Sequence, residues 1–357
     1  MSDLQISLLG IGACVVAGVY AFNSWQERQF RRLSEAAFER EHDDVLMPAA
    51  PAADDVAEAR IEPTLDAPPA ASVFKAPVPR ARAAVMVDPV IDYVVEAELA
   101  TPAASAGLHD ELSGLAMDWH KPVLVAGYDA ATGVWLPAGM DSGSEHAQLR
   151  FALQMSNRSG CIEREQLSAF RDAVQKWAES RGGKIKCLDI DLAHAMAVQL
   201  DRFCADVDIA IGVNVVTRDS APISGTKIRA LAEAGGLKLE SDGVFYLRGD
   251  SGNTLYTLDN HEPMPFMPEQ IKTLSTGGVT FLLDVPRVAD ALREFEGMLA
   301  CARSFGSKLG GTLVDDNRNA LTEDAIDKIR RQLTGILATM EAGQIAAGGA
   351  RALRLFS

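Results

Sequence analysis

The apolar positions of the chain change their spacing several times, and the clearest changes lie in its second half. An alternation through Val207, Val213 and Val215 predicts a half-buried strand over residues 207–216. A helix is expected over 220–236, where two glycines would end it. The pattern then predicts two strands joined by a turn within 243–258, a strand over 278–286, a helix over 288–311, a strand over 312–314 and a helix over 322–341.

The first half repeats this order of elements. It predicts a strand over 92–100, a helix over 108–119, a strand–turn–strand segment over 122–138, a strand over 149–156, a helix over 167–183, a strand over 184–190 and a helix over 192–204. In this comparison Trp177 takes the place of Phe305. We therefore expect an α+β chain with two tandem split β-α-β units, each with helices on one face of its sheet.

The amino-terminal pattern is different, because residues 4–22 carry no charge and are long enough to cross a membrane. Positive residues follow this stretch at Arg28, Arg31 and Arg32, whereas a cleaved signal peptide would begin with them. The positive-inside rule then places the amino terminus in the periplasm and the remainder of the chain in the cytoplasm. The expectation is a single uncleaved transmembrane helix.

Small residues share one stripe of that helix at Gly10, Cys14 and Gly18. Such a stripe could support self-association, although small residues are also common in membrane helices without a partner. Residues 41–88 are rich in Ala, Pro and acids and lack an apolar period, so they are expected to be a disordered linker. The pattern as a whole indicates a membrane anchor, a flexible tether and a folded region after it.

The charge and the cysteine content of the chain argue against several functional classes. The net charge of −15 argues against a protein that binds nucleic acid by neutralising phosphates. The central strands also lack outward aromatic and basic residues, which disfavours an RNA-binding sheet. The five cysteines form no CxxC pair and indicate reduced thiols in a cytoplasmic compartment.

Two adjacent acids, Asp315 and Asp316, are the most conspicuous candidates for chemistry. A calcium loop starting at Asp315 would need Gly at Ala320 and Glu at Ile326, so the metal motif fails. We interpret the acids as the junction between a strand and a loop. The histidines show no metal-ligand spacing, and the sequence contains no P-loop or GxSxG motif, so we expect no enzyme activity, no cofactor and no metal.

The second half resembles the ZipA family of bacterial cell division proteins. The resemblance rests on the stretch GVTFLLDVP, a long helix, the stretch GGTLVDDNRNALT and a final helix, preceded by an anchor and a Pro/Ala linker. It implies an antiparallel sheet with helices on one face, whose bare face is a shallow apolar groove for the carboxyl-terminal tail of FtsZ. It also implies a location at the division septum on the inner membrane, and a role in tethering FtsZ there.

The alternation of the strands lets this groove be assigned to residues. The expected tail-binding residues are Ala210, Gly212, Val244, Tyr246, Thr257, His261, Thr280 and Leu282. Small residues at Ala210 and Gly212 are expected to leave room beside Leu282. The matching face of the first unit would carry Val94, Glu96, Glu98, Arg150, Ala152 and Gln154, which makes it a poor apolar groove.

The expected domain organisation follows from the boundaries of the predicted elements. It comprises an anchor over 1–25, a charged segment and linker over 26–88, a first unit over 89–205, a second, FtsZ-binding unit over 206–341 and a tail over 342–357. The alternative to an FtsZ tether is an envelope scaffold of the same architecture that binds another protein.

Overall fold

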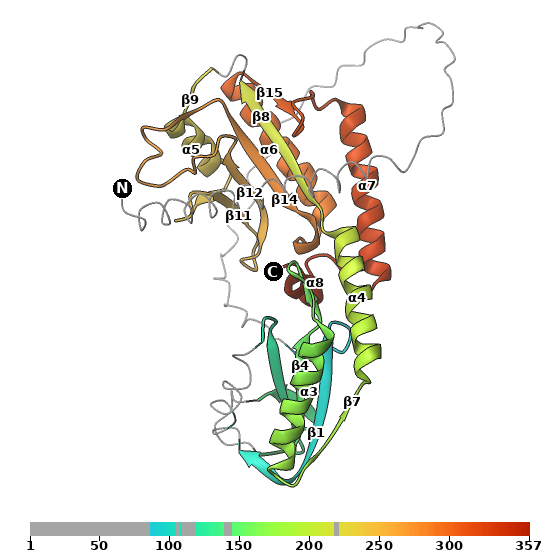
Figure 1. The fold of residues 1–357 in the computed structure, drawn as a ribbon. Coiled ribbons are helices and arrows are strands. Elements are labelled where there is room, and N and C mark those ends of the chain that lie inside the picture. Colours follow the sequence, from blue (N-terminus) through green and yellow to red (C-terminus); the bar gives the residue numbers. More distant parts are fainter. Residues whose placement is uncertain (1–85, 105–107, 109–118, 139–144, 218–220) are drawn as a thin grey trace, which may run out of the picture. The chain divides into compact units, whose positions relative to one another are not determined.

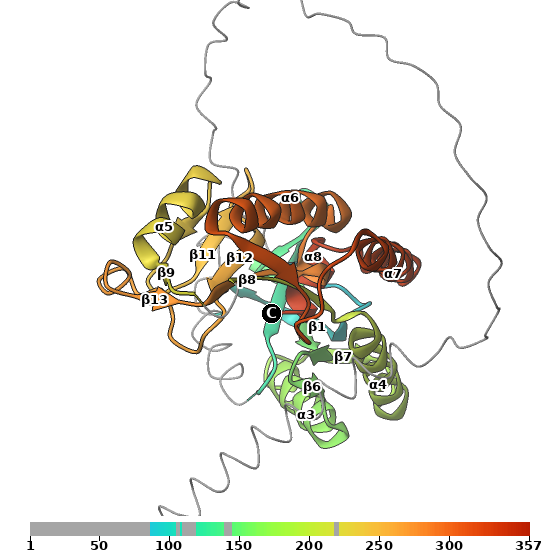
Figure 2. The same cartoon turned by 90° about the horizontal axis from the view of Figure 1, so that it is seen from above.

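The fold is described from a computed structural model, which covers residues 86–104, 108, 119–138, 145–217 and 221–357. These residues belong to one compact unit, residues 76–357, and contain two large antiparallel sheets with helices packed on them, together with two two-stranded sheets, β5-β6 and β9-β13 (Figures 1 and 2). The mixed α+β class and the antiparallel sheets predicted from the sequence are confirmed.

The first unit has a five-stranded sheet in the order β3-β2-β4-β1-β7. Its elements are β1 (Asp92–Ala104), β2 (Val123–Asp129), β3 (Val134–Pro137), β4 (Glu145–Gln154), β5 (Ser156–Asn157), β6 (Gly160–Cys161), α3 (Arg164–Glu179), β7 (Lys184–Cys187) and α4 (Ile190–Val207). The inward side chains of β1 and β4 pack against α3, where Phe151 meets Trp177 with ring centroids 5.1 Å apart. This aromatic contact joins sheet to helix at the centre of the first core.

The second unit has a six-stranded sheet in the order β10-β11-β12-β14-β8-β15. Its elements are β8 (Ala210–Thr217), β9 (Ile223–Ser224), α5 (Gly225–Ala234), β10 (Lys238–Leu239), β11 (Phe245–Arg248), β12 (Thr254–Asn260), β13 (Ser275–Thr276), β14 (Gly278–Asp284), η2 (Val285–Arg287), α6 (Ala291–Leu309), β15 (Gly311–Val314) and α7 (Glu323–Ala342). Val213 and Val215 of β8 point into the core, as their alternation predicts.

Helix α6 supplies the largest part of this second core. Phe295, Met298 and Phe305 lie on the stripe predicted from the sequence and are buried against the sheet. Phe305 meets Phe281 of β14 edge to face, with ring centroids 5.2 Å apart. The helix ends at Gly310, whose φ of 71° is the left-handed conformation that glycine adopts without strain. Trp177 and Phe305 thus make matching contacts in the two units.

The two sheets differ in how their hairpins attach. In the second unit the later strand of the hairpin, β12, pairs with β14, whereas in the first unit the earlier strand, β2, pairs with β4. The predicted equivalence of residues 122–138 and 243–258 therefore holds for the strand–turn–strand pattern but not for the order of the strands. Alternation along a strand fixes which side chains share a face but not which neighbour the strand selects.

The carboxyl-terminal residues are folded and belong to the first core. Helix α8 (Ala350–Leu355) buries Ala352, Leu355 and Phe356 in the cluster formed by the first sheet and its helices. Two ion pairs hold this helix to the start of β1: Arg351 with Asp88, and Arg354 with Asp92. The region predicted as a separate tail over 342–357 is an integral part of the fold.

Several sequence boundaries move in the structure. Val207, expected in a strand, closes helix α4, and the strand itself begins at Ala210. The predicted transmembrane segment lies outside the described residues, as do the predicted linker up to residue 85 and most of the helix expected over 108–119, whereas Asp88, the predicted end of the linker, pairs with Arg351 of the folded part. Within the described ranges, no helix has the length and apolar character needed to span a bilayer.

Candidate functional site

The second sheet has one face without a helix, which is called the open face below. The helices α5, α6 and α7 contribute to the core on the other side, and the open face is turned toward the viewer in Figure 1. Strand register places six of the eight residues predicted to bind the tail on this face, while Val244 comes directly before β11 and His261 directly after β12. The eight residues are Ala210, Gly212, Val244, Tyr246, Thr257, His261, Thr280 and Leu282.

Cross-strand register arranges the open face in rows. Gly212, Leu282, Thr257 and Tyr246 stand directly opposite one another on β8, β14, β12 and β11. Leu282 occupies an inner strand of this row, yet it is 42% exposed. Because a large apolar side chain at this position lacks cover on a central strand, this row is the best candidate for a contact with a partner.

The space above Gly212 is filled, contrary to the expectation of open room beside Leu282. A Cβ atom built on Gly212 would come within 3.1 Å of the Oδ1 atom of Asp316. The glycine thus permits a carboxylate from the loop after β15 to lie on the open face. This correction arises because the loop and β8 are far apart in sequence, so no local pattern relates them.

A chain of polar contacts continues from Asp316 across the sheet. The Asn214 side-chain amide donates to Asp316 Oδ1 at 2.9 Å, and the Thr280 hydroxyl donates to Asn214 Oδ1 at 2.6 Å. The next member is His261, whose Nδ1 lies 3.3 Å from the Thr280 hydroxyl. Asn214 is 2% exposed, so these partners satisfy a buried amide.

The far side of the open face is also fixed by hydrogen bonds. The Tyr246 hydroxyl donates to Asp242 at 2.6 Å, and this bond raises the pKa of Tyr246 to about 12. The Arg248 guanidinium lies over the Tyr246 ring and pairs with Glu240 at 2.5 Å. These contacts hold the aromatic ring at the edge of the row that contains Leu282.

The Asp315–Asp316 pair acts structurally, as its sequence position suggested. Asp315 Oδ1 accepts the backbone N–H groups of Asn317 and Asn319 at 2.9 and 2.7 Å, which closes the loop. Arg318, between them, has a φ of 63°, a left-handed conformation uncommon for a residue with a side chain. The loop is therefore held in one shape that projects Arg318 outward.

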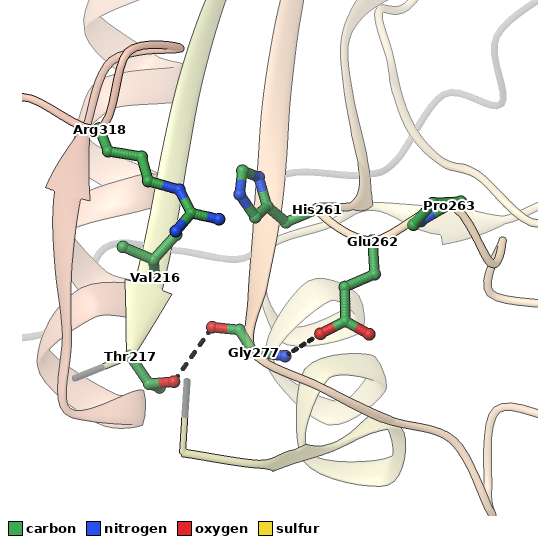
Figure 3. A pocket seen from close by; sticks show the side chains of 7 residues that line it. All are labelled: Val216, Thr217, His261, Glu262, Pro263, Gly277 and Arg318. Carbon is green, nitrogen blue, oxygen red and sulfur yellow. Dashed lines mark hydrogen bonds between the residues drawn. The ribbon is translucent and has the colours of Figure 1, made fainter. Parts of the chain in front are cut away.

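A hollow of about 440 Å³ lies at the end of the open face, beside this loop (Figure 3). Arg318 and His261 point toward one another across it. The floor includes Gly277, whose carbonyl accepts the Thr217 hydroxyl at 3.0 Å and whose N–H donates to Glu262 at 2.8 Å. His261 is the member of the hollow that sequence reasoning assigned to the site.

Asp316 and Arg318 are functional candidates that the sequence did not assign to the face. Asn214 shares the outward parity of Ala210 and Gly212, so the alternation predicts it on this face, although it is not among the predicted tail-binding residues. Asp316 and Arg318 reach the face from a loop, and strand parity gives no signal for loop residues. Only the fold brings them beside β8.

The matching face of the first unit differs from its prediction. Glu98 is exposed, and Arg150 pairs with Glu96 at 2.7 Å while its guanidinium lies over the Trp135 ring. Ala152, expected to face solvent, is fully buried. Its register places it between Val94 and Leu124, whose larger side chains flank its methyl group.

The second unit is thus an antiparallel sheet with helices on one side and a partly apolar face, with Leu282 exposed, on the other. Residues 209–332 match the family described as ZipA, C-terminal FtsZ-binding domain, and they form a domain of that family. The similarity to ZipA cell division proteins covers about a third of the chain.

Curated relatives agree with this assignment. The chain is 33% identical over 126 residues to the cell division protein ZipA of Marinobacter nauticus, which covers 34% of the chain and 37% of the relative. It is 29% identical over 127 residues to ZipA of Vibrio cholerae, covering 34% and 44%. With ZipA of Ectopseudomonas mendocina it shares 28% over 141 residues, covering 38% and 52%. The chain thus matches about half or less of each relative's length.

Proposed function

We propose that this protein binds the carboxyl-terminal tail of FtsZ on the open face of the second unit and tethers FtsZ to the inner membrane at the division site. The observation that carries the proposal is the row of Gly212, Leu282, Thr257 and Tyr246 across the centre of that face. The family name, which describes an FtsZ-binding domain, supports the choice of partner.

The open face suits a short apolar peptide. Leu282 presents an apolar side chain at its centre, with the Tyr246 ring on an outer strand of the same row. On a shallow surface the binding energy concentrates in a few anchors near the middle of the contact. An apolar side chain of the tail placed on Leu282 would therefore contribute a large share of the affinity.

The same face is poorly suited to catalysis. The Asp316 carboxylate accepts from Asn214, and the Tyr246 hydroxyl donates to Asp242. These titratable groups are used to hold loops and strands in place. The proposal is accordingly for a domain that acts by binding.

The tethering part of the proposal rests on the sequence of the amino-terminal region. Residues 4–22 supply a transmembrane anchor, and Arg28, Arg31 and Arg32 retain the following chain in the cytoplasm. Residues 41–88 give the folded domain reach from the membrane surface. The curated relatives, named cell division protein ZipA, support the role in cell division.

The test is Leu282→Glu in the full-length protein, measured by the affinity for a synthetic peptide covering the carboxyl-terminal end of FtsZ from the same organism. A charge at this position would be desolvated under the bound peptide, so affinity is expected to fall at least about tenfold, or about 1.4 kcal/mol. The melting temperature should change little, because Leu282 is already 42% exposed.

Leu192→Glu is the matched control, since Leu192 is a leucine of helix α4 that is 52% exposed. It should leave peptide affinity unchanged. If Leu282→Glu folds and binds the peptide normally, the open face is not the binding site. If the wild-type protein does not bind the FtsZ peptide, a different protein partner has to be sought.

A further inference from the structure

We infer that the hollow between Arg318 and His261 receives an acidic side chain of the docked peptide and so sets its register on the open face. This inference rests on the proposed function, because it assigns one subsite of the same surface. It adds a charged contact to a face whose central row is apolar and neutral.

The position of Arg318 is fixed by its loop. Its backbone N–H donates to the Asp315 carbonyl at 3.0 Å, and Asp315 holds the residues on both sides through its carboxylate. A bridge between Val314 and Ala320 closes the base of the loop. A cation displayed on a loop held in this way loses less freedom on binding than one on a mobile segment.

The guanidinium of Arg318 makes no ion pair or hydrogen bond to any residue that the structure describes. Arg248, which also lies at this face, is paired with Glu240 at 2.5 Å. On the helix side, Arg303 is paired with Glu323 at 2.5 Å. Arg318 is thus a cation at the edge of the candidate site whose donors are directed into a hollow rather than onto a neighbour (Figure 3).

The rest of the open face would repel an acidic side chain. Asp316 lies over Gly212, and Asp259 stands opposite Thr280. Like charges brought together cost free energy on binding, whereas a carboxylate beside Arg318 gains it. An acidic side chain of the peptide placed beside Arg318 therefore fixes the alignment of the apolar residues that follow or precede it. Lys238, opposite Tyr246 on β10, is a second cation of this face and lies at its other edge.

The Glu262 carboxylate does not lie beside Arg318, where the peptide carboxylate is expected to bind. Its carboxylate accepts the Gly277 N–H at 2.8 Å and lies on the other side of His261 from Arg318 in Figure 3. His261 presents its imidazole between the two, with Nδ1 beside the Thr280 hydroxyl. With the Thr280 hydroxyl donating to Asn214, His261 Nδ1 donates to Thr280, so the hydrogen-bond donors offered to an anion in this hollow are those of the Arg318 guanidinium.

The experiment measures the affinity of the full-length protein for the FtsZ peptide and for versions in which each Asp or Glu is replaced singly by its amide. We expect Arg318→Gln to lower the affinity for the unmodified peptide by about three- to fivefold, which is the range of an exposed ion pair. One of the peptides with an amide replacement should bind Arg318→Gln and the wild-type protein equally well. The acidic residue replaced in that peptide is the one that Arg318 contacts. Arg303→Gln removes an equal charge from α6 and should leave every affinity unchanged.

The outcomes separate this inference from the proposed function. If the unmodified peptide binds and Leu282→Glu weakens it while Arg318→Gln does not, the inference fails and the function stands. Equal weakening by Arg318→Gln and Arg303→Gln for all peptides would show an effect of net charge alone and would overturn it. A peptide with an amidated carboxyl terminus gives a further control. If Arg318→Gln loses its effect only with that peptide, Arg318 contacts the terminal carboxylate, and the assignment to an acidic side chain is overturned. If the unmodified peptide does not bind at all, the function fails first.

Discussion

Single residues decide which parts of the open face can receive a partner. Gly212 has no side chain, and the Asp316 carboxylate uses the vacated space to accept the buried amide of Asn214. The exposed Leu282 lies in the same row as Gly212. Gly212 therefore leaves space for the Asp316 carboxylate, whereas Leu282, opposite it on the next strand, presents an apolar side chain to solvent.

Asp316 gives a prediction at this scale. Asp316→Asn keeps an oxygen that can accept from Asn214, so stability should be retained and peptide affinity should change by less than about twofold. Asp316→Leu removes the acceptor and leaves a buried amide without its partner, which should cost about 1–3 kcal/mol. Denaturant unfolding of both variants measures the difference. Equal stabilities of the two variants would show that the Asn214 contact contributes nothing.

The elements of the second unit follow from local rules, and their docking depends on a few contacts between them. Helix α7 begins at Thr322, whose hydroxyl accepts the Ala325 N–H at 3.3 Å, as its sequence predicted. Its position against α6 is fixed by Arg330, which binds both carboxylate oxygens of Glu296 at 2.5 and 2.9 Å. This two-point contact joins the helices on the side of the sheet away from the open face.

The Glu296–Arg330 pair predicts a pH dependence of stability. The hydrogen bond from Arg330 lowers the pKa of Glu296 below its usual value of 4.5. A lowered pKa in the folded state means that the contribution is present above the usual pKa and is lost as the pH falls through the folded value. The pair is largely solvent-exposed, so its contribution near neutral pH should be no more than about 1 kcal/mol.

Comparison of the wild-type protein with Glu296→Gln tests this prediction. The difference in unfolding free energy should be largest near neutral pH and should disappear in acid below pH 4.5, once Glu296 is protonated. Glu323→Gln, which removes a carboxylate of an exposed pair at the start of α7, serves as the control. A difference for Glu296→Gln that stays constant with pH would contradict the assigned pKa shift.

In the whole molecule, the end of the chain returns to the first unit. Phe356 is fully buried there, and its backbone carbonyl accepts the Arg287 guanidinium of η2 at 2.6 Å. Arg158 of the first unit pairs with Asp208 and Asp284 at 2.7 Å. The carboxyl-terminal segment and this network connect both cores, so we expect the described part of the chain to unfold in one transition.

Phe356→Ala tests this connection. Removing a buried aromatic side chain should cost about 3–5 kcal/mol and lower the single melting temperature. Leu353→Ala in the preceding helix α8 is the control, because Leu353 is 37% exposed and its loss should cost far less. Two separate transitions in Phe356→Ala, with the second unit unaffected, would show that the cores are energetically independent.

The sequence by itself determined the elements and the facing of their side chains. Alternation in β8 and β14 placed Ala210, Gly212, Thr280 and Leu282 on one face, because successive side chains of a strand point to opposite sides. The helical stripe through Phe295 and Phe305 identified the buried face of α6 for the same kind of reason. These are local properties, set by backbone geometry within a few residues.

The tertiary structure alone decided what depends on contacts between distant residues. It brought Asp316 over Gly212, aimed Arg318 at His261, inverted the hairpin order in the first unit and placed Phe356 in a core that begins near Ile91. Each of these contacts joins segments far apart in the chain, and the strand period carries no information about which partner a loop, hairpin or terminus meets. The open face could therefore be predicted in outline, whereas the charged hollow at its end could not.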